Sequence, residues 1–239
     1  MTGGLAVTDL SAGYGDVHVL SDISMLVETG AITAVIGSNG AGKTTLLRSL
    51  SGLLKPRKGS VRLGTIDLAG QKPLDFVKAG IAHVPEGRRL FAGMTVEDNL
   101  LMGGFSLAVG QAELRQDLER VYATFPKLAE RRRQDAVSMS GGEQQMCAIG
   151  RGLMSRPKVM MIDELSLGLA PVAVDFLVEA LKSISVSGVA LIVVEQDVAV
   201  ALDMAKHVVV MDRGRITKSG ASNEVSADPA IRAAYLGAD

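Results

Sequence analysis

Several features that mark other classes of protein are scarce in this chain. It has a single cysteine, Cys147, so no internal disulfide framework is possible and a reducing compartment is expected. The formal net charge is −1, which gives no overall electrostatic reason to expect nucleic-acid or anionic-lipid binding. No uncharged stretch is long and apolar enough to span a bilayer, and the N-terminus lacks the basic start and apolar core of a signal peptide. We therefore expect a cytoplasmic protein, peripheral if it serves a membrane process.

The second half of the sequence alternates between apolar runs and helical patterns. Strands are expected at Val159–Asp163, Val189–Val194 and His207–Met211, with the helices Pro171–Ile184 and Val198–Met204 between them. Such continuous apolar runs are typical of parallel strands covered on both faces, and their alternation with helices indicates right-handed crossovers. With 239 residues, 47% of them hydrophobic, the chain fits one large α/β domain or one domain with an inserted subdomain.

The first half adds further strands and a helical insertion. Leu5–Asp9 and His18–Val27 are predicted to be strands joined by the turn Ala12–Asp16. Thr95–Arg133 is predicted to be a helical arm outside the sheet, and it opens on Thr95-x-x-Asp98, a pattern that caps a helix. No internal repeat, low-complexity tract or long linker interrupts this organisation.

A glycine-rich loop separates the predicted strand Ala31–Ile36 from the predicted helix Lys43–Leu53. It fits G-x-x-x-x-G-K-[ST], in which backbone N–H groups close around phosphates at the positive end of a helix. Lys43 is expected to reach the β- and γ-phosphates, and Thr44 to offer its hydroxyl to Mg²⁺. A chance glycine-rich turn would explain neither the Gly-Lys-Thr ending nor the flanking elements. The predicted nucleotide-binding residues here are Gly37, Ser38, Asn39, Gly40, Ala41, Gly42, Lys43, Thr44 and Thr45.

Two adjacent carboxylates end the predicted strand Val159–Asp163. The carboxyl ends of parallel strands are where ligands bind, and successive strand side chains diverge, so Asp163 and Glu164 suit two different tasks. Asp163 is expected to hold the Mg²⁺ shell, and Glu164 to polarise a water in line with the γ-phosphate. Without the phosphate loop upstream, a pair of acidic turn residues would be the better interpretation.

The segment Ser140-Gly-Gly-Glu-Gln144 is short and could serve only as a helix cap. Its glycines nevertheless leave the helix N-terminus open to an anion. Together with the phosphate loop and the carboxylate pair, this segment makes nearly the whole chain resemble the ATP-binding-cassette family. The resemblance implies that Ser140, Gly141 and Gly142 bind the γ-phosphate held in the phosphate loop of a partner subunit.

Other positions can be compared with the same family. The resemblance implies that Tyr14 stacks on adenine, the alternative being a packed turn residue, and that Ser166–Leu169 crosses the seam between two cassettes. Three positions depart from the usual family pattern. Glu86 replaces a glutamine, Gln196 replaces a histidine, and Leu165 replaces a proline.

The first two departures point to one subfamily. The segments Val84–Phe91 and Val194–Gln196 are similar to the shorter (LivF-type) ATPase subunit of branched-chain amino acid importers, in which Glu86 and Gln196 are ordinary. That resemblance does not explain Leu165.

The predicted catalytic set is Lys43, Glu86, Glu164 and Gln196, and the predicted Mg²⁺ ligands are Thr44, Asp163 and Glu86. Gln196 can donate a hydrogen bond to the γ-phosphate but cannot become cationic as histidine does. More of the catalytic load is therefore expected to fall on Glu164, Lys43 and Mg²⁺.

The resemblance and the motifs predict a P-loop α/β fold. It would have a three-layer core with a mostly parallel sheet, an N-terminal antiparallel β-subdomain and an inserted helical subdomain. Residues 1–239 would form one ATPase domain, with the catalytic core and β-subdomain in 1–94 and 138–239 and the helical subdomain in 95–137.

The expected activity is ATP hydrolysis, with Mg²⁺ as cofactor, that powers an importer for branched-chain or related hydrophobic amino acids. The expected partners are a second ATPase subunit, identical or not, and permease subunits that hold the protein on the inner face of the cell membrane; no nucleic acid is expected. Three alternatives remain: an importer for urea or another amide, a soluble cassette acting on DNA or ribosomes, and a catalytically weak nucleotide-dependent regulatory module.

The segment Glu86–Met94 is expected to couple ATP to the permeases. It starts beside the predicted nucleotide site and runs into the helical arm, and it combines the charges of Arg88 and Arg89 with exposed apolar side chains. Such a patch suits a docking helix. The alternative is that Phe91 only packs the arm against the sheet.

Overall fold

Two β-sheets organise the protein, and the computed structural model describes residues 4–233. The strands are β1 (Leu5–Tyr14), β2 (Val17–Val27), β3 (Ile32–Ile36), β4 (Lys58–Leu63), β5 (Ile66–Asp67), β6 (Ile81–Val84), β7 (Val159–Asp163), β8 (Ala190–Glu195), β9 (His207–Asp212) and β10 (Arg215–Ala221). The helices are α1 (Lys43–Leu50), α2 (Pro73–Ala79), α3 (Val96–Met102), α4 (Gln111–Thr124), α5 (Pro126–Glu130), α6 (Gly141–Leu153), α7 (Pro171–Val186), α8 (Val198–Met204), α9 (Ser222–Ser226) and α10 (Pro229–Ile231), with a 3-10 turn at Ala136–Ser138.

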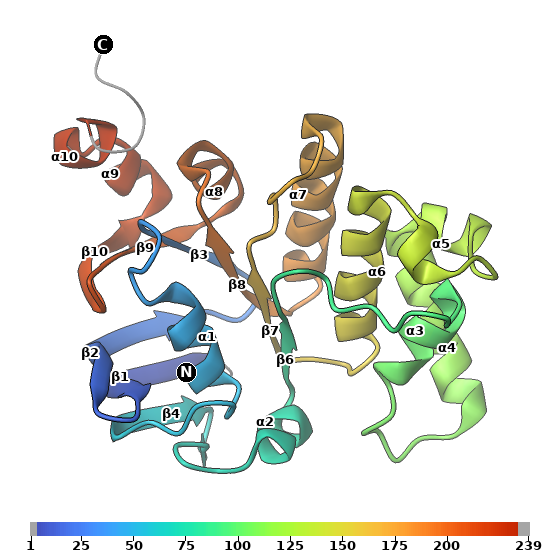
Figure 1. Ribbon diagram of the computed structural model, residues 1–239, viewed down its shortest axis with the longest axis horizontal. Coiled ribbons are helices and arrows are strands. Elements are labelled where there is room, and N and C mark those ends of the chain that lie inside the picture. Colours follow the sequence, from blue (N-terminus) through green and yellow to red (C-terminus); the bar gives the residue numbers. More distant parts are fainter. Residues whose placement is uncertain (1–3, 234–239) are drawn as a thin grey trace.

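The larger sheet has the strand order β10-β9-β3-β8-β7-β6, and all of its pairings are parallel except that of β10 with β9. The smaller sheet, β2-β1-β4-β5, is antiparallel and is built almost entirely from the N-terminal part of the chain (Figure 1). The predicted α/β class, with a mostly parallel sheet and an N-terminal antiparallel one, is confirmed.

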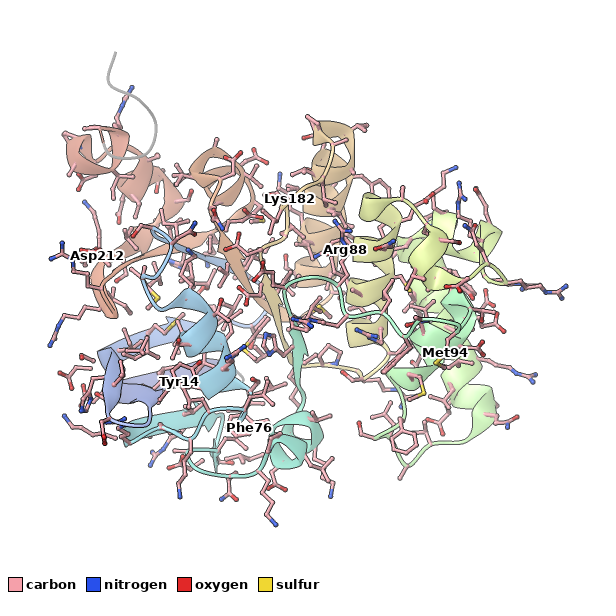
Figure 2. All side chains as sticks on the ribbon, viewed as in Figure 1. Tyr14, Phe76, Arg88, Met94, Lys182 and Asp212 are labelled. Atoms are coloured by element: carbon pink, nitrogen blue, oxygen red, sulfur yellow. The ribbon has the colours of Figure 1, made fainter. Side chains whose placement is uncertain are left out.

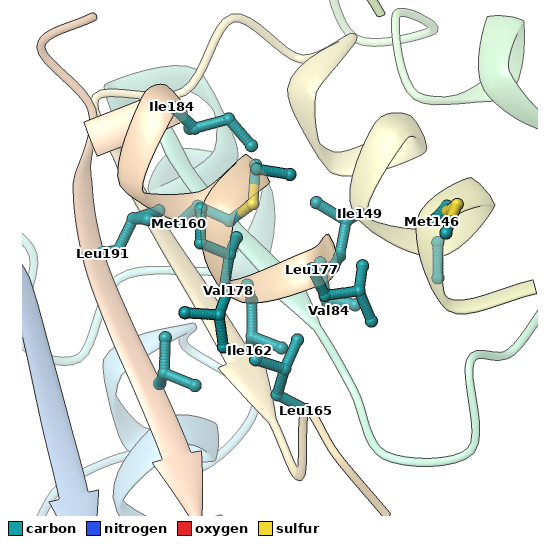
Figure 3. Packing of buried hydrophobic residues seen from close by; sticks show 14 of the residues in the cluster. Val84, Met146, Ile149, Met160, Ile162, Leu165, Leu177, Val178, Ile184 and Leu191 are labelled. Carbon is teal, nitrogen blue, oxygen red and sulfur yellow. The ribbon is translucent and has the colours of Figure 1, made fainter. Parts of the chain in front are cut away.

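Side chains of the parallel strands alternate between two apolar cores. In β7, Met160 and Ile162 join the core beneath α6, α7 and α8, where Figure 3 shows them beside Leu177 and Val178. Met161, between them, joins the other core with α1 and the antiparallel sheet. This alternation follows from the two-residue period of a strand, and burying each such side chain contributes roughly 1.5–3 kcal/mol. The strands are therefore apolar on both faces, which gives the three-layer arrangement.

Helix α1 lies between the antiparallel sheet and the parallel sheet (Figure 1). Leu46, Leu47 and Leu50 are fully buried there, against residues of both sheets. Packing on two sides holds the helix rigidly, so its N-terminus and the glycine-rich loop before it have a defined position at the edge of the sheet.

The predicted arm is helical, but it is not continuous. It consists of α3, α4 and α5, which lie together on one side of the molecule (Figure 1). The first break follows α3 at Gly103, where a Cβ atom would lie 1.9 Å from the carbonyl oxygen of Arg151. The second is at Pro126, which starts α5 because proline cannot donate to the preceding turn. Arg156 anchors the arm to the core through a 2.8 Å ion pair with Asp117.

The predicted turn Ala12–Asp16 is also shorter than expected. Strand β1 continues to Tyr14, and the hairpin turn is confined to Gly15 and Asp16. Register shifts along Val7–Gly13 let β1 keep pairing with β2 through this irregular stretch.

Nowhere in residues 4–233 is there a helix with the length and apolar character needed to cross a membrane.

Candidate functional site

The glycine-rich loop lies between β3 and α1, as predicted. Gly40 and Gly42 adopt left-handed backbone conformations, with φ of 81° and 102°. Gly42 also caps α1, and a Cβ atom there would lie 2.9 Å from a methyl carbon of Leu20. Glycine at this position therefore satisfies both a backbone and a packing requirement, and it keeps the N-terminus of α1 accessible.

A cleft of about 460 Å³ opens over this loop. From the loop and α1 it is lined by Asn39, Gly40, Gly42, Lys43, Thr44 and Thr45. Glu86, Glu164 and Gln196 complete it from the loops after β6, β7 and β8. Three neighbouring parallel strands thus deliver one polar side chain each to the same cleft, because their carboxyl ends lie at one edge of the sheet. The predicted catalytic residues are brought together.

Lys43 is buried, with only 6% of its surface exposed. Its Nζ donates hydrogen bonds to the carbonyl oxygens of Gly37, at 2.7 Å, and Ser38, at 3.2 Å. The ammonium group is therefore held over the loop by two carbonyls. An anion bound in the loop would meet this charge in a site shielded from bulk water, where electrostatic attraction is strengthened.

Thr44, which lines the cleft, contacts the buried side chain of Asp163. The Thr44 hydroxyl donates to Asp163 Oδ1 at 3.5 Å, so both oxygens are placed to serve one cation. Burial raises the pKa of Asp163, the hydrogen bond from Thr44 lowers it, and the charges of Glu164 and Glu86 raise it further. A bound cation would relieve this accumulation of negative charge.

The residues present fit Mg²⁺ better than they fit a metal with a full set of protein ligands. No group of three or more histidine, cysteine, aspartate or glutamate side chains suited to hold a metal occurs in the described part of the chain. Mg²⁺ typically keeps several waters and takes only one or two protein ligands plus phosphate oxygens. A site made of Thr44 and Asp163 has that character.

Glu164 has a strained backbone, with φ of 56°. Its N–H donates to the carbonyl oxygen of Val194, at 3.1 Å, which ties the end of β7 to β8. A non-glycine residue in the left-handed region costs of order 1 kcal/mol and persists only where its surroundings enforce it. The conformation turns the Glu164 side chain into the cleft.

Leu165 helps to enforce that conformation. Its side chain is fully buried and packs in the core beneath α7, near Ile162 and Leu177 (Figure 3). The residue that departs from the family pattern is therefore an apolar anchor directly after Glu164. Packing, instead of a proline ring, restrains this loop.

Several predicted residues are not part of the lining of the cleft: Gly37, Ser38 and Ala41 of the loop, Asp163, Tyr14, and Ser140–Gly142. Tyr14 is 42% exposed at the end of β1, and its Oη accepts a hydrogen bond from Arg48 at 3.2 Å. Its stacking on adenine stays a prediction. Ser140 caps α6, and its hydroxyl accepts from the N–H of Glu143. Gly141 and Gly142 form the first turn of the same helix.

The chain matches the family model described as ABC transporter over residues 20–166. The chain belongs to the ABC transporter family. It is 42% identical over 233 residues to the high-affinity branched-chain amino acid transport ATP-binding protein BraG of Pseudomonas aeruginosa, covering 98% of this chain and 99% of that protein. It is also 32% identical to the probable branched-chain amino acid transport ATP-binding protein LivF of Archaeoglobus fulgidus, covering 92% and 93% of the two chains.

Solved ABC transporter cassettes share the fold. One is a crystal structure of the ADP conformation of an ATP-binding cassette, with a TM-score of 0.85, 25% identity and full coverage of both chains. The cleft described above therefore belongs to a nucleotide-binding ATPase, the subunit that powers an ABC transporter.

Sequence reasoning missed two features of this cassette. Val19 lines the cleft from β2, outside any motif, and only the pairing of the antiparallel sheet brings it there. Glu195 was noted only as part of Val194–Gln196, although its carboxylate binds two loops at the edge of the site. The position of Glu195 at the end of an apolar strand was the sequence signal that could have identified it as a buried carboxylate.

Proposed function

We propose that this ABC ATPase powers an importer for branched-chain amino acids. The observation that supports this most is the similarity to BraG along almost the whole length of both chains. The shared fold alone would suit any ABC transporter. Glu86 and Gln196, two departures from the usual family pattern, both line the cleft and fit the same subfamily.

The proposed roles of the site residues follow from the geometry. Lys43 exchanges the carbonyl oxygens of Gly37 and Ser38 for the phosphates of ATP, while the loop N–H groups enclose them. Thr44, Asp163 and Glu86 would hold Mg²⁺. When bound, Mg²⁺ would neutralise phosphate charge. Glu164 polarises the attacking water, and the Gln196 amide donates to the γ-phosphate.

The site is proposed to be completed by a second ATPase subunit. Ser140, Gly141 and Gly142 stand at the N-terminus of α6, where the helix dipole favours an anion, yet they do not line the cleft of their own chain. Their partner phosphate would therefore lie in the loop of the other subunit. The subfamily resemblance favours a nonidentical partner.

A second groove is the proposed docking site for a permease helix. It encloses about 260 Å³ between β6, the end of α3 and α6, and it includes Phe91, Met102 and Arg151. Neither Arg151 Nη1 nor His83 Nε2, both buried, has a hydrogen-bond partner within residues 4–233. Burial, and to a lesser extent the charge of Arg48, together lower the pKa of His83 to about 4, so the ring is neutral at physiological pH. An apolar helix could cover this groove, and a carboxylate or free carbonyl on it would accept a hydrogen bond from Arg151.

The segment Glu86–Met94 connects this groove to the cleft. The Arg88 guanidinium donates to the side chain of Gln144 on α6 at 3.3 Å (Figure 2), so Arg88 makes an internal contact within the proposed coupling segment. The Arg151 guanidinium donates to the carbonyl oxygen of Arg88 and lies over the ring of Phe91, 5.1 Å from its centroid. A displacement of Glu86 would therefore be transmitted through these contacts to both α6 and the groove.

Phe91 is the residue that tests this docking surface. Phe91 is 44% exposed although the Arg151 guanidinium of α6 lies over its ring, so part of the side chain is accessible to a partner. Phe91→Ala, and separately Arg89→Glu, are expected to reduce transport and permease co-purification while the isolated subunit retains its ATPase activity. Leu26→Ala, at an exposed apolar position on β2, is the control. Normal transport and assembly in both variants would place the coupling surface elsewhere.

The substrate proposal is tested by uptake. Cells that lack this chain are expected to lose uptake of labelled leucine, isoleucine and valine, and to regain it with the wild-type chain but not with Lys43→Ala. Loss of urea uptake, with normal uptake of these amino acids, would assign the amide-importer alternative. Absence of Mg²⁺-dependent phosphate release from the assembled transporter would favour the regulatory alternative.

A further inference from the structure

Glu195, the last residue of β8, is a fully buried carboxylate. Its Oε1 accepts a hydrogen bond from the backbone N–H of Ser166 at 2.7 Å. Its Oε2 accepts from the Ser166 hydroxyl, at 2.9 Å, and from the N–H of Gln196, at 3.1 Å. A buried carboxylate is unfavourable unless it is fully hydrogen-bonded, and these donors come from two separate loops.

The two loops carry different parts of the hydrolytic site. Ser166 lies two residues after Glu164, at the start of the segment Ser166–Leu169. Gln196 directly follows Glu195 and lines the cleft opposite the phosphate loop. The backbone hydrogen bond from Glu164 to Val194 ties the first loop to β8 directly before Glu195. Glu195 itself does not line the cleft, so it has no direct access to the nucleotide.

We propose that Glu195 is a positioning residue for ATP hydrolysis, which clamps the loop of Glu164 to the loop of Gln196. The clamp keeps the group that polarises water and the group that binds the γ-phosphate in one fixed relation. It also fixes the start of the Ser166–Leu169 segment relative to the cleft. This inference rests on the roles proposed above for Glu164 and Gln196, and it is independent of the transported substrate.

The chemistry requires a carboxylate of this length. All three partners donate, so both side-chain oxygens must accept. In Glu195→Gln, the amide NH₂ would replace one acceptor and face an N–H group, leaving at least one buried donor without a partner. In Glu195→Asp, the side chain is one methylene shorter and would not reach both loops from the same backbone position.

The first experiment separates binding from turnover. Glu195→Gln is expected to lower kcat for ATP about tenfold or more, with KM for ATP within about twofold of wild type, because the lost contact positions catalytic groups without binding substrate. Asp117→Asn is the matched control: Asp117 is also a buried carboxylate, but it binds Arg156 and Arg120 in the arm. This control is expected to lower thermal stability and leave kcat close to wild type. A Glu195→Gln variant that turns over as fast as the control overturns the proposal.

The second experiment changes Ser166, which donates hydrogen bonds to Glu195. Ser166→Ala removes the hydroxyl donor and is expected to lower kcat by a smaller factor, about threefold, again with little change in KM. The double variant is expected to lose less than the product of the two single losses, since both act on one network. If Glu195→Gln does not fold, Ser166→Ala decides alone, and unchanged turnover overturns the proposal.

ATP hydrolysis by Glu164→Gln, measured in parallel, tests the proposed role of Glu164 separately from the clamp. Glu164→Gln that hydrolyses ATP normally would overturn the proposed role of Glu164. Slow hydrolysis in Glu164→Gln together with normal kcat in Glu195→Gln would overturn only the clamp.

Discussion

Replacing Lys43 by alanine is expected to reduce ATP hydrolysis by about a hundredfold or more, the usual cost of removing a preorganised charge from a phosphate site. Lys43 is the one cationic side chain of the phosphate loop, and it is buried where its charge is poorly screened. Phosphate release from Mg-ATP by the purified subunit, with nucleotide affinity measured beside it, is the test. We expect both to fall.

A stability measurement and one control variant make this result specific. Lys43 also holds the carbonyl oxygens of Gly37 and Ser38, so alanine could disturb the loop as well as remove a charge. A folded Lys43→Ala protein with an unchanged melting temperature would separate these effects. Lys55→Ala, at an exposed lysine shortly after α1, is expected to be fully active. Normal turnover in Lys43→Ala would contradict the proposed site.

Glu164→Gln is expected to slow hydrolysis by about 10²–10⁴-fold, since an amide cannot accept a proton from the attacking water. The substitution keeps the shape of the side chain, and the buried Leu165 still anchors the strained loop. ATP binding and the contacts of Thr44 and Asp163 should persist. The variant should therefore accumulate as an ATP-bound dimer, with the α6 N-terminus of each subunit on the nucleotide of the other.

Sedimentation of Glu164→Gln with and without ATP measures this directly, and it should be repeated with a partner ATPase subunit present. Glu179→Gln, an exposed glutamate on α7 that pairs with Lys182, is the control and should remain in the wild-type state. If Glu164→Gln stays monomeric under every condition, including with the partner, the composite site assigned to Ser140–Gly142 is wrong.

Features encoded within short segments were predictable from the sequence. The phosphate loop lies where its glycines and Lys43 indicated, and the apolar runs became the central parallel strands. The arm was predicted as helical, without a division into separate helices. Gly103 and Pro126, where the structure breaks it, are the local signals that could have divided it.

Contacts between distant residues that belong to no shared motif were beyond sequence reasoning. The clamp joins Glu195 to Ser166 across 29 residues, and the link from Arg88 to Gln144 spans 56. A motif shows which side chains are available, but the folded chain decides which of them share a buried space, because hydrogen bonds there depend on positions set by packing.

The amino-acid sequence by itself determined the family, the α/β class and the residue types proposed to bind phosphate and Mg²⁺, since each depends on a local pattern. The tertiary structure decided that Glu86, Glu164 and Gln196 enter one cleft, that Leu165 replaces a proline by packing, and that Arg88 faces α6. The physical reason is that the order and register of the strands set where their carboxyl ends lie, and non-local packing sets that order.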